Sequence, residues 1–407
     1  KSRAMAKRMM VAARVLGMVA VAAASAACGA DPGAGAGAGG GDPPGVGTAL
    51  DFGDAGTVVA MPTGDVIVFS HDPNVITTVV SIDATLEEHD VTTRPANVMG
   101  IAGAPDGSLV VTGHSALEHT NSEGLWISGP PVLTRFDAQG ATAWSVPMVV
   151  EAMAVDAQGD IYLSSASPTP VRIGGGTIAT DAHHQSYIVK LAPDGTYLWS
   201  VAFGNGSGVP SLAVTPDGVV GIASDMADFE VAGVHVEGAY FAEFDADGTP
   251  ITAASIGPGL QLELSSAVVA DANGFVTAAS NAPEGLVARW DLHGAQVWQR
   301  TVQGLVALAG DRTGSVYVGV AGAAANLGAS DPDPDGALVI GTFDADGNLG
   351  AKREIAPMLA VFPRADAIPV VNLPSVAALP GGRLFVGMEP VAGTTDLSVR
   401  WTLQVVD

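Results

Sequence analysis

Cysteine is almost absent from this chain of 407 residues, in which Cys28 stands alone. A single cysteine has no partner within the chain, so no disulfide framework holds the fold together. Basic residues are also scarce, because 17 Lys and Arg stand against 42 Asp and Glu, for a net charge of −25. After residue 27 the only lysines are Lys190 and Lys352. A chain without a basic stripe cannot neutralise phosphates, and this excludes nucleic acid as an expected partner.

Long hydrophobic runs are missing as well. A bilayer span takes about 20 apolar residues, whereas the N-terminal apolar run covers only residues 15–24. Five basic residues precede this run, and small residues follow it. This order predicts a secretory signal peptide over residues 1–27. Its removal takes away five positive charges and no negative ones, which brings the net charge to about −30.

Cys28 follows the small-residue tract Ser25-Ala26-Ala27 at the end of that segment. The segment resembles a bacterial lipoprotein signal, in which the cysteine is acylated and becomes the mature N-terminus. The resemblance implies a lipid anchor on Cys28 and a location at the cell envelope, at the outer membrane or the surface. Ser25 departs from the pattern, which usually has Leu or a similar apolar residue there. The alternative is ordinary cleavage after Ala26, which leaves Cys28 as a free thiol near the new end.

The segment 28–47 is, apart from its cysteine, almost wholly Gly, Ala, Pro and Asp. Such a segment cannot bury a core, so we expect a flexible tether. Its reach is on the order of 25 Å, which suits a folded body held close to a membrane.

From residue 48 onward the sequence lacks helical periodicity, and short β-rich runs alternate with Gly, Asp and Pro turns. The stretch 187–224 contains both halves of a repeated unit, one turning at Pro193-Asp194-Gly195 and one at Pro216-Asp217-Gly218. Asp-Gly between alternating apolar residues predicts β-hairpins, because Gly accepts positive φ and Asp bonds the turn backbone.

The spacing of the repeats predicts the architecture. The turn glycines Gly140, Gly195, Gly248, Gly294 and Gly347 follow one another at steps of 55, 53, 46 and 53 residues. Periods of roughly 40–50 residues with about four strands each are typical of propeller blades. Residues 48–407 divided by seven give about 51 residues per blade. We therefore predict an all-β fold, a seven-bladed β-propeller of four-stranded antiparallel blades over residues 48–407. Stacked sandwiches or a β-solenoid are the alternatives.

The two ends of this domain are predicted to share one sheet. The last segment, residues 397–401, ends within its outer strands, so residues 48–52 can complete that sheet and close the ring. Closure would leave no free edge between the first and last blades.

Residues 156–204 carry a resemblance through DAQGDIYLSSA, SYIVKLAPDGTYLWS and VAFG. They resemble the SBBP type of bacterial β-propeller repeat, and the turn followed by Trp resembles quinoprotein-like propellers. The resemblance covers residues 98–354 and is poor in the first and last blades. It implies a secreted or surface scaffold and transfers no catalytic residue.

One acidic loop has the opening of a calcium site. Asp331, Asp333 and Asp335 alternate before Gly336, as carboxylates do around a hard cation. The closing acid is missing, because Thr342 and Val339 stand where it would be needed. A solvated acidic loop is therefore the expected structure, with no metal or other cofactor, and calcium is the alternative.

Histidines form two further clusters, His183-His184 in one insert and His114 with His119 in the matching insert of the preceding blade. They are expected to be exposed loop residues, with a transition-metal site as the alternative.

The paired acids Asp245 with Asp247 and Asp344 with Asp346 are expected to be turn residues. Sister blades hold Gln139 and His293 in these places.

Trp144, Trp199 and Trp298 recur at a fixed offset after their turns. We expect them to pack between blades rather than to bind sugars. No catalytic or cofactor-binding residue can be assigned. The sequence therefore favours a non-enzymatic binding or scaffold module, anchored to the membrane by lipid and directed at a protein or glycan ligand. The alternative is a propeller enzyme, such as a lyase, hydrolase or quinone-dependent dehydrogenase, with its site in the central channel.

Overall fold

The computed structural model describes the strands of residues 50–406 and most of their turns. The described ranges are 50–52, 56–60, 66–71, 77–82, 88–94, 97–114, 119–120, 126–127, 130–167, 171–173, 176–178, 185–204, 210–224, 228–257, 266–281, 284–310, 316–327, 338–355, 375–378, 384–388 and 401–406. Side chains are described only between Gly100 and Lys352, with gaps. The predicted signal peptide, Cys28 and the tether lie outside these residues.

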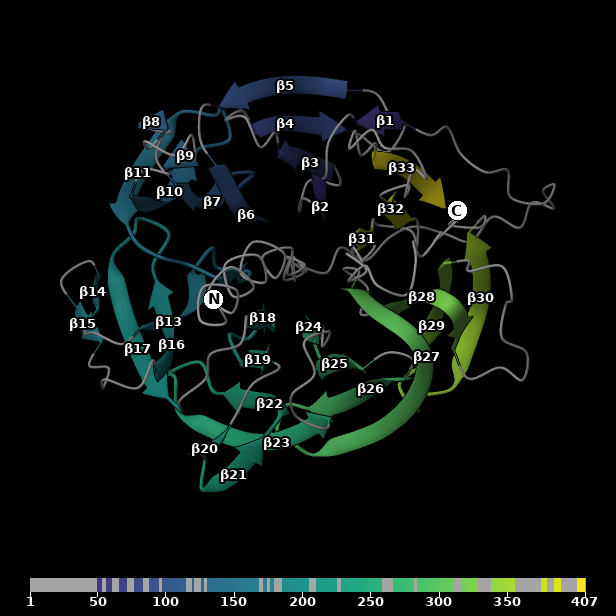
Figure 1. Ribbon diagram of the computed structural model, residues 1–407. Coiled ribbons are helices and arrows are strands. Elements are labelled where there is room, and N and C mark those ends of the chain that lie inside the picture. Colours follow the sequence, from purple (N-terminus) through teal and green to yellow (C-terminus); the bar gives the residue numbers. More distant parts are fainter. Residues whose placement is uncertain are drawn as a thin grey trace, which may run out of the picture.

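In the described part of the chain, six antiparallel sheets of four or more strands are arranged around a central axis (Figure 1). Sheet A contains β2 (Gly56–Ala60), β3 (Val66–His71), β4 (Thr77–Ile82) and β5 (Glu88–Arg94). Sheet B contains β6 (Asn97–Gly103), β7 (Leu109–His114), β10 (Pro131–Phe136) and β11 (Thr142–Pro147). Sheet C contains β12 (Ala152–Val155), β13 (Ile161–Ser167), β16 (Gln185–Leu191) and β17 (Tyr197–Phe203). Sheet D contains β18 (Ser211–Val214), β19 (Val220–Ser224), β22 (Ala239–Phe244) and β23 (Pro250–Gly257).

Sheet E has seven strands and sheet F has four. Sheet E contains β24 (Ser266–Asp271), β25 (Gly274–Asn281), β26 (Glu284–Asp291), β27 (Gln296–Gly310), β28 (Val316–Asn326), β29 (Leu338–Phe343) and β30 (Leu349–Ile355). Sheet F contains β31 (Ser375–Ala378), β32 (Leu384–Met388), β33 (Trp401–Val406) and β1 (Leu50–Phe52). The N-terminal half of β27 pairs with β26 and its C-terminal half with β28, so one long strand joins two halves of sheet E.

The innermost strands touch one another all the way round the ring. β2 contacts β6, and the contacts continue through β12, β18, β24, β27 and β31 back to β2. The chain is thus an all-β propeller built of four-stranded antiparallel units, as the repeat spacing predicts. The count of seven blades stays a prediction, because β27 runs unbroken through two units of sheet E.

The ring is closed by its two ends. β1 pairs antiparallel with β33, with Leu50 opposite Leu403 and Phe52 opposite Trp401. β1 is therefore the outermost strand of sheet F. The prediction that residues 48–52 complete the last sheet is confirmed for residues 50–52, the part of that segment that the structure describes.

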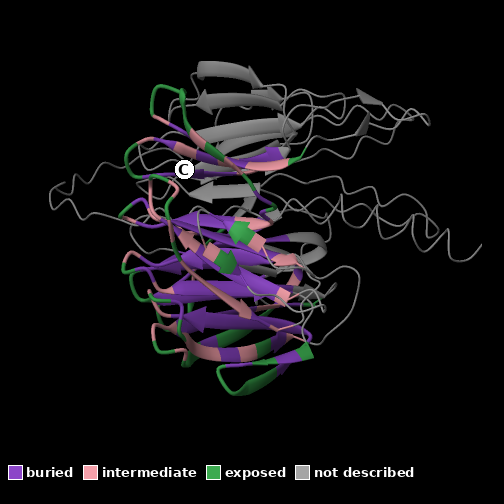
Figure 2. Cartoon of the chain, turned by 90° about the vertical axis from the view of Figure 1, so that its left-hand side faces the viewer, coloured by how far each residue is buried: buried purple, intermediate pink, exposed green. Residues whose placement is uncertain are grey.

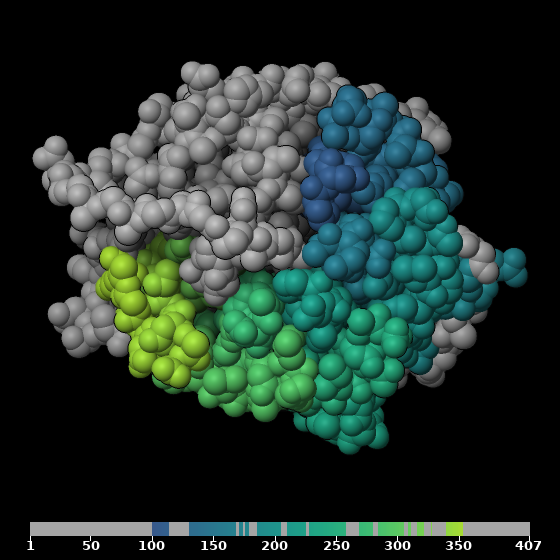
Figure 3. Space-filling model, turned by 180° about the vertical axis from the view of Figure 1, so that it is seen from behind, coloured from purple at the N-terminus to yellow at the C-terminus, as the bar shows by residue number. Residues whose placement is uncertain are grey.

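Buried residues are shown in purple in Figure 2. They form apolar clusters between sheets B and C, C and D, and D and E, and a further cluster between the two halves of sheet E. The middle strands β19 and β22 are buried along their whole length, whereas the outer strand β11 alternates between exposed and half-buried residues. The middle strands are covered on both faces, and their sequences are therefore continuous apolar runs and do not alternate between apolar and polar residues. Seen from behind, sheets B to E follow one another round the molecule (Figure 3).

Three small hairpins extend from sheets B, C and D, each inserted between the second and third strands. They are formed by β8 (His119–Thr120) with β9 (Trp126–Ile127), β14 (Val171–Ile173) with β15 (Gly176–Ile178), and β20 (Asp228–Val231) with β21 (Val234–Glu237). Ile173 and Ile178 are buried with residues of sheets B and C, and Phe229 and Val236 with residues of sheets C and D. Both hairpins therefore reinforce the seam with the preceding sheet. In the part of the chain that the structure describes, no helix has the length and hydropathy to cross a bilayer.

Candidate functional site

Eight five-residue turns share one backbone geometry. In each, the first residue donates its N–H to the carbonyl of the fifth, and the glycine at the fourth place donates to the carbonyl of the first. These glycines have φ between 75° and 83°. The turns span 104–108, 137–141, 156–160, 192–196, 215–219, 245–249, 291–295 and 344–348. Because the strands of a meander alternate in direction, all eight turns lie on one face of the ring, which we call the turn face.

Aspartates cap these turns. The Oδ1 atoms of Asp137, Asp156, Asp245, Asp291 and Asp344 each accept N–H groups from the residues two and four places later, at 2.8–3.0 Å. The N–H of Asn348 lowers the pKa of Asp344, since it stabilises the charged carboxylate. The sequence prediction that Asp245 and Asp344 are turn residues is confirmed.

Tryptophans of three outer strands, β11, β17 and β27, each join one four-stranded unit to the next. Trp144 Nε1 donates to the carbonyl of Pro193 at 2.9 Å, and Trp199 Nε1 donates to that of Ala246 at 2.9 Å. Trp298 Nε1 donates to the carbonyl of Ala345 at 3.0 Å. Each acceptor belongs to the turn of the following unit. Trp298 is buried and the other two are half-buried, so the expected packing of these residues between blades is confirmed.

Charged side chains of the third strands lie just behind these turns. Arg135 on β10 bonds Asp106 at 2.9 Å and reaches across to the carbonyl of Pro193 at 3.1 Å. Arg289 on β26 forms a buried bidentate pair with Asp271, at 2.6 and 2.7 Å. Both cations therefore neutralise an acid of their own sheet, and Arg135 also contacts the next one.

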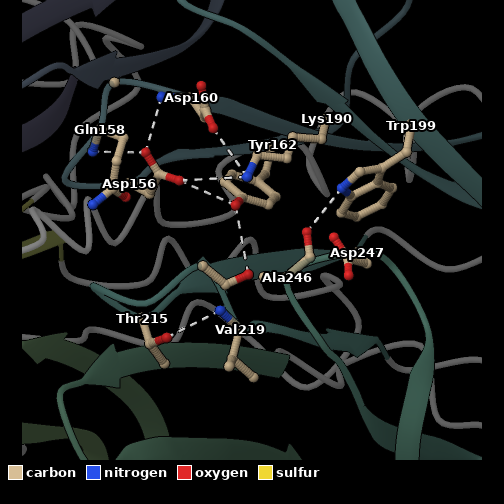
Figure 4. Close-up of polar contacts among 12 residues, drawn as sticks. Asp156, Gln158, Asp160, Tyr162, Lys190, Trp199, Thr215, Val219, Ala246 and Asp247 are labelled. Carbon is tan, nitrogen blue, oxygen red and sulfur yellow. Dashed lines mark hydrogen bonds and ion pairs between the residues drawn. The ribbon is translucent and has the colours of Figure 1, made fainter.

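Lys190 on β16 belongs to a polar cluster at the turn face (Figure 4). Its Nζ lies 2.9 Å from Asp160 Oδ2 and 3.9 Å from Asp156 Oδ2, and 4.9 Å from the centre of the Tyr162 ring. Tyr162 donates its hydroxyl to Asp156 Oδ2 at 3.1 Å. Burial raises the pKa of the Tyr162 phenol, helped by the charge of Asp156, so the phenol stays protonated. Each polar group has partners, as in a structural network.

Glu243 occupies the same place on β22 with the opposite charge. It stands two residues before the first residue of its turn, like Arg135, Lys190 and Arg289. Its side chain is fully buried, and neither carboxylate oxygen has a hydrogen-bond partner among the described residues. Burial raises the pKa of Glu243 to about 7, and the charge of Asp291 adds to this. Sequence reasoning missed this residue, although aligning the third strands of the repeats would have revealed the charge reversal.

The innermost strands carry small and aliphatic side chains. Their sequences are NVMGIAG in β6, AMAV in β12, SLAV in β18 and SAVVAD in β24. Among the residues whose side chains are described, no three His, Cys, Asp or Glu are grouped so that they could hold a metal ion.

Several sequence-predicted residues lie outside the described part of the chain. They are Cys28, His183, His184, Asp331, Asp333 and Asp335. His114 ends β7 and His119 begins β8, but their side chains are not described. The calcium and transition-metal hypotheses therefore stay predictions.

No family model matches the chain, and no curated protein sequence matches it. Among solved structures it is similar to BamB from Moraxella catarrhalis, with 14% identity and a TM-score of 0.44 over 87% of this chain and 86% of that one. It is similar to the PQQ-bound aldose sugar dehydrogenase of Streptomyces coelicolor, with 11% identity and a TM-score of 0.37 over 89% and 100%. It is also similar to the Dos1 propeller, with 10% identity and a TM-score of 0.43 over 87% and 93%. At these identities the similarity concerns the fold alone.

Proposed function

We propose that this chain is an exported, lipid-anchored β-propeller that acts as a rigid, non-enzymatic binding scaffold at the bacterial cell envelope. The observation that carries the proposal is the repeated contact of a tryptophan with the turn of the next unit. Such contacts make the ring stiff and place its loops in fixed positions, which is what a binding platform requires.

The charged groups of the turn face support the same role. Arg135, Lys190 and Arg289 are each engaged with acids of the protein, so they tie the scaffold together. The variable parts are the hairpins and loops around the ring, which is where binding residues are concentrated in rigid scaffolds. The partner we propose is a protein or a glycan.

Cys28 supplies the proposed anchor. The apolar run of residues 15–24 before it and the Gly-rich tether after it match an acylated N-terminus followed by a spacer. A folded ring held in this way would stay within roughly 25 Å of the membrane surface.

The test expresses the full chain in a Gram-negative host and separates membrane from soluble fractions, with wild type and Cys28→Ser compared. We expect wild type in the detergent-extracted membrane fraction and the variant in the soluble periplasmic fraction. Metabolic labelling with an alkyne fatty acid should mark wild type alone. A wild-type protein that is soluble and unlabelled would refute the anchor.

The proposed scaffold role is tested separately, by asking whether the purified protein remains bound to a partner. Detergent-extracted wild type is expected to migrate on native gels above its 40.7 kDa monomer mass, in a complex that survives purification. Turnover of sugar or ester substrates by the purified protein, lost in a variant of the central channel, would instead establish the enzyme alternative.

A further inference from the structure

The seam between sheets D and E lacks the devices that join its neighbours. Where β11, β17 and β27 carry a tryptophan four residues after the turn glycine, β23 carries Thr252, which lies against Gly294 of the next turn. Sheets C and D each cover their preceding seam with a hairpin, whereas only residues 282 and 283 separate β25 from β26. The seam between D and E therefore lacks a described tryptophan clamp and a hairpin.

Aromatic packing and one central hydrogen bond hold this seam instead. Phe241 of β22 stacks on Trp290 with ring centres 5.0 Å apart, and it lies 5.6 Å from Phe275. The N–H of Val268 donates to Ser211 Oγ at 3.2 Å. All three contacts join sheet D to sheet E, and none involves a charge.

Glu243 is placed in this apolar seam. Gly221 stands opposite it on β19, and the space beside Gly221 is filled by the rings of Phe275 and Phe241. On its other side, Thr252 stands opposite it on β23. The carboxyl is thus surrounded by groups that cannot neutralise a negative charge.

The titratable groups around Glu243 favour its neutral form. From sheet E, Asp291 faces it with the same charge, and His293 of the same turn interacts with Asp291. The first residue of the sheet D turn 215–219 is Thr215, where the matching turn of sheet C has Asp156. Asp217 in the same turn of sheet D is a further acid and not a cation. The one buried cation of the adjoining strands, Arg289, is already bidentate with Asp271 among the described residues.

We propose that the seam between sheets D and E is a pH-controlled opening of the ring, closed while Glu243 is protonated and loosened when it ionises. An uncompensated charge in an apolar interface must gain water. The D–E interface can admit water because it has neither the bond from an indole N–H to the next turn nor the hairpin that hold the B–C and C–D seams. The direction of the pH dependence of stability agrees with this proposal. Glu243 has a higher pKa in the folded chain than in the unfolded one. At pH values between these two pKa values, the folded state therefore binds more protons than the unfolded state. Stability therefore falls as the pH rises from about 4.5 to about 7, and it is level above that.

The test measures unfolding by urea from pH 5 to pH 8 for wild type, Glu243→Gln and Glu243→Leu. Glu237→Gln is the control, since Glu237 is an exposed acid of the β20–β21 hairpin that extends from sheet D. We expect the unfolding constant of wild type to rise by about two orders of magnitude more than that of either Glu243 variant. Equal pH slopes in wild type and Glu243→Gln would overturn the proposal. Two Glu243 variants are used because Gln keeps the shape and Leu keeps the apolar packing.

Hydrogen exchange locates the opening. Protection factors of β18, β22, β24 and β26 are expected to fall in wild type between pH 5 and pH 8, while those of β13 and β16 in sheet C stay unchanged. Glu243→Gln should keep the same strands protected at both pH values. A loss of protection spread evenly over all sheets would contradict a local seam and overturn the proposal.

Discussion

The indole N–H of Trp199 bonds the carbonyl oxygen of Ala246, 47 residues later and in the next sheet, at 2.9 Å. The same ring lies over Gly248, where a Cβ would come within 2.8 Å of it. One aromatic residue thus holds the neighbouring turn in position and also requires a glycine at its fourth place.

Truncation of this residue should weaken the ring. Trp199→Ala is expected to lower the free energy of unfolding by about 2–3 kcal/mol, less than for a fully buried tryptophan because the ring is half-buried. Trp199→Phe should cost about 1 kcal/mol, since it removes the hydrogen bond but keeps most of the packing. Leu198→Ala is the control, because Leu198 is 46% exposed. Urea unfolding measures all three, and equal losses at both positions would contradict the clamp.

Substitutions at two turn glycines can distinguish the cost of backbone strain from the cost of close packing. Gly140 and Gly248 have φ of 79° and 83°, but a Cβ at Gly140 meets nothing within 4 Å. Gly140→Ala should therefore cost about 1–2 kcal/mol for the left-handed conformation alone. Gly248→Ala should cost more, because the methyl group also displaces Trp199. Equal costs, measured by chemical denaturation, would show that the indole moves away freely.

The tip of the β20–β21 hairpin offers a stabilising substitution. Ala232 has φ of 53° and is followed by Gly233 at 73°, which is the geometry of a turn that favours Asn-Gly. Ala232→Asn should raise the free energy of unfolding by about 0.5–1 kcal/mol. Ala141→Asn is a control at an exposed turn position without positive φ. A gain at both sites, seen as matching shifts in melting temperature, would point to a cause other than backbone strain.

The buried pair of Arg289 and Asp271 should depend strongly on both partners. Asp271→Asn is expected to cost about 3–5 kcal/mol, because it leaves a buried guanidinium without a counter-charge. The double variant Arg289→Met with Asp271→Leu should recover most of that loss. A double-mutant cycle with Arg289→Met and Asp271→Leu as its single variants, measured by urea unfolding, checks this, and additive losses would mean that the pair does not interact.

The loop of Asp331, Asp333 and Asp335 is expected to bind calcium little or not at all. A real site would gain stability as calcium fills it. The measurement is thermal unfolding with chelator and then with millimolar calcium, on wild type and Asp333→Ala. A calcium-dependent rise in melting temperature that is lost in the variant would contradict the prediction.

Local sequence alone determined the turns and hence the strands. A glycine at the fourth place and an oxygen acceptor in the turn specify its backbone within five residues, so Asp344 could be assigned to its turn without knowledge of its neighbours. The repeat spacing then predicts the ring, and the unfinished outer edge of the last sheet predicts that residues 48–52 complete it, which the pairing of Leu50 with Leu403 confirms.

Only the tertiary structure decided what these elements contact. The sequence indicates that Trp199 packs between sheets, but its acceptor, Ala246, belongs to another repeat. Glu243 lies opposite Gly221 on β19 and across a seam from Phe275 on β25. The pairing of β19 with β22 and the packing of sheet E on sheet D bring these three residues together. Turn geometry depends on a few consecutive residues, whereas burial and charge pairing depend on which distant strands become neighbours. The sequence therefore predicts the ring, and the packing of one sheet on the next determines where it is held tightly and where it can open.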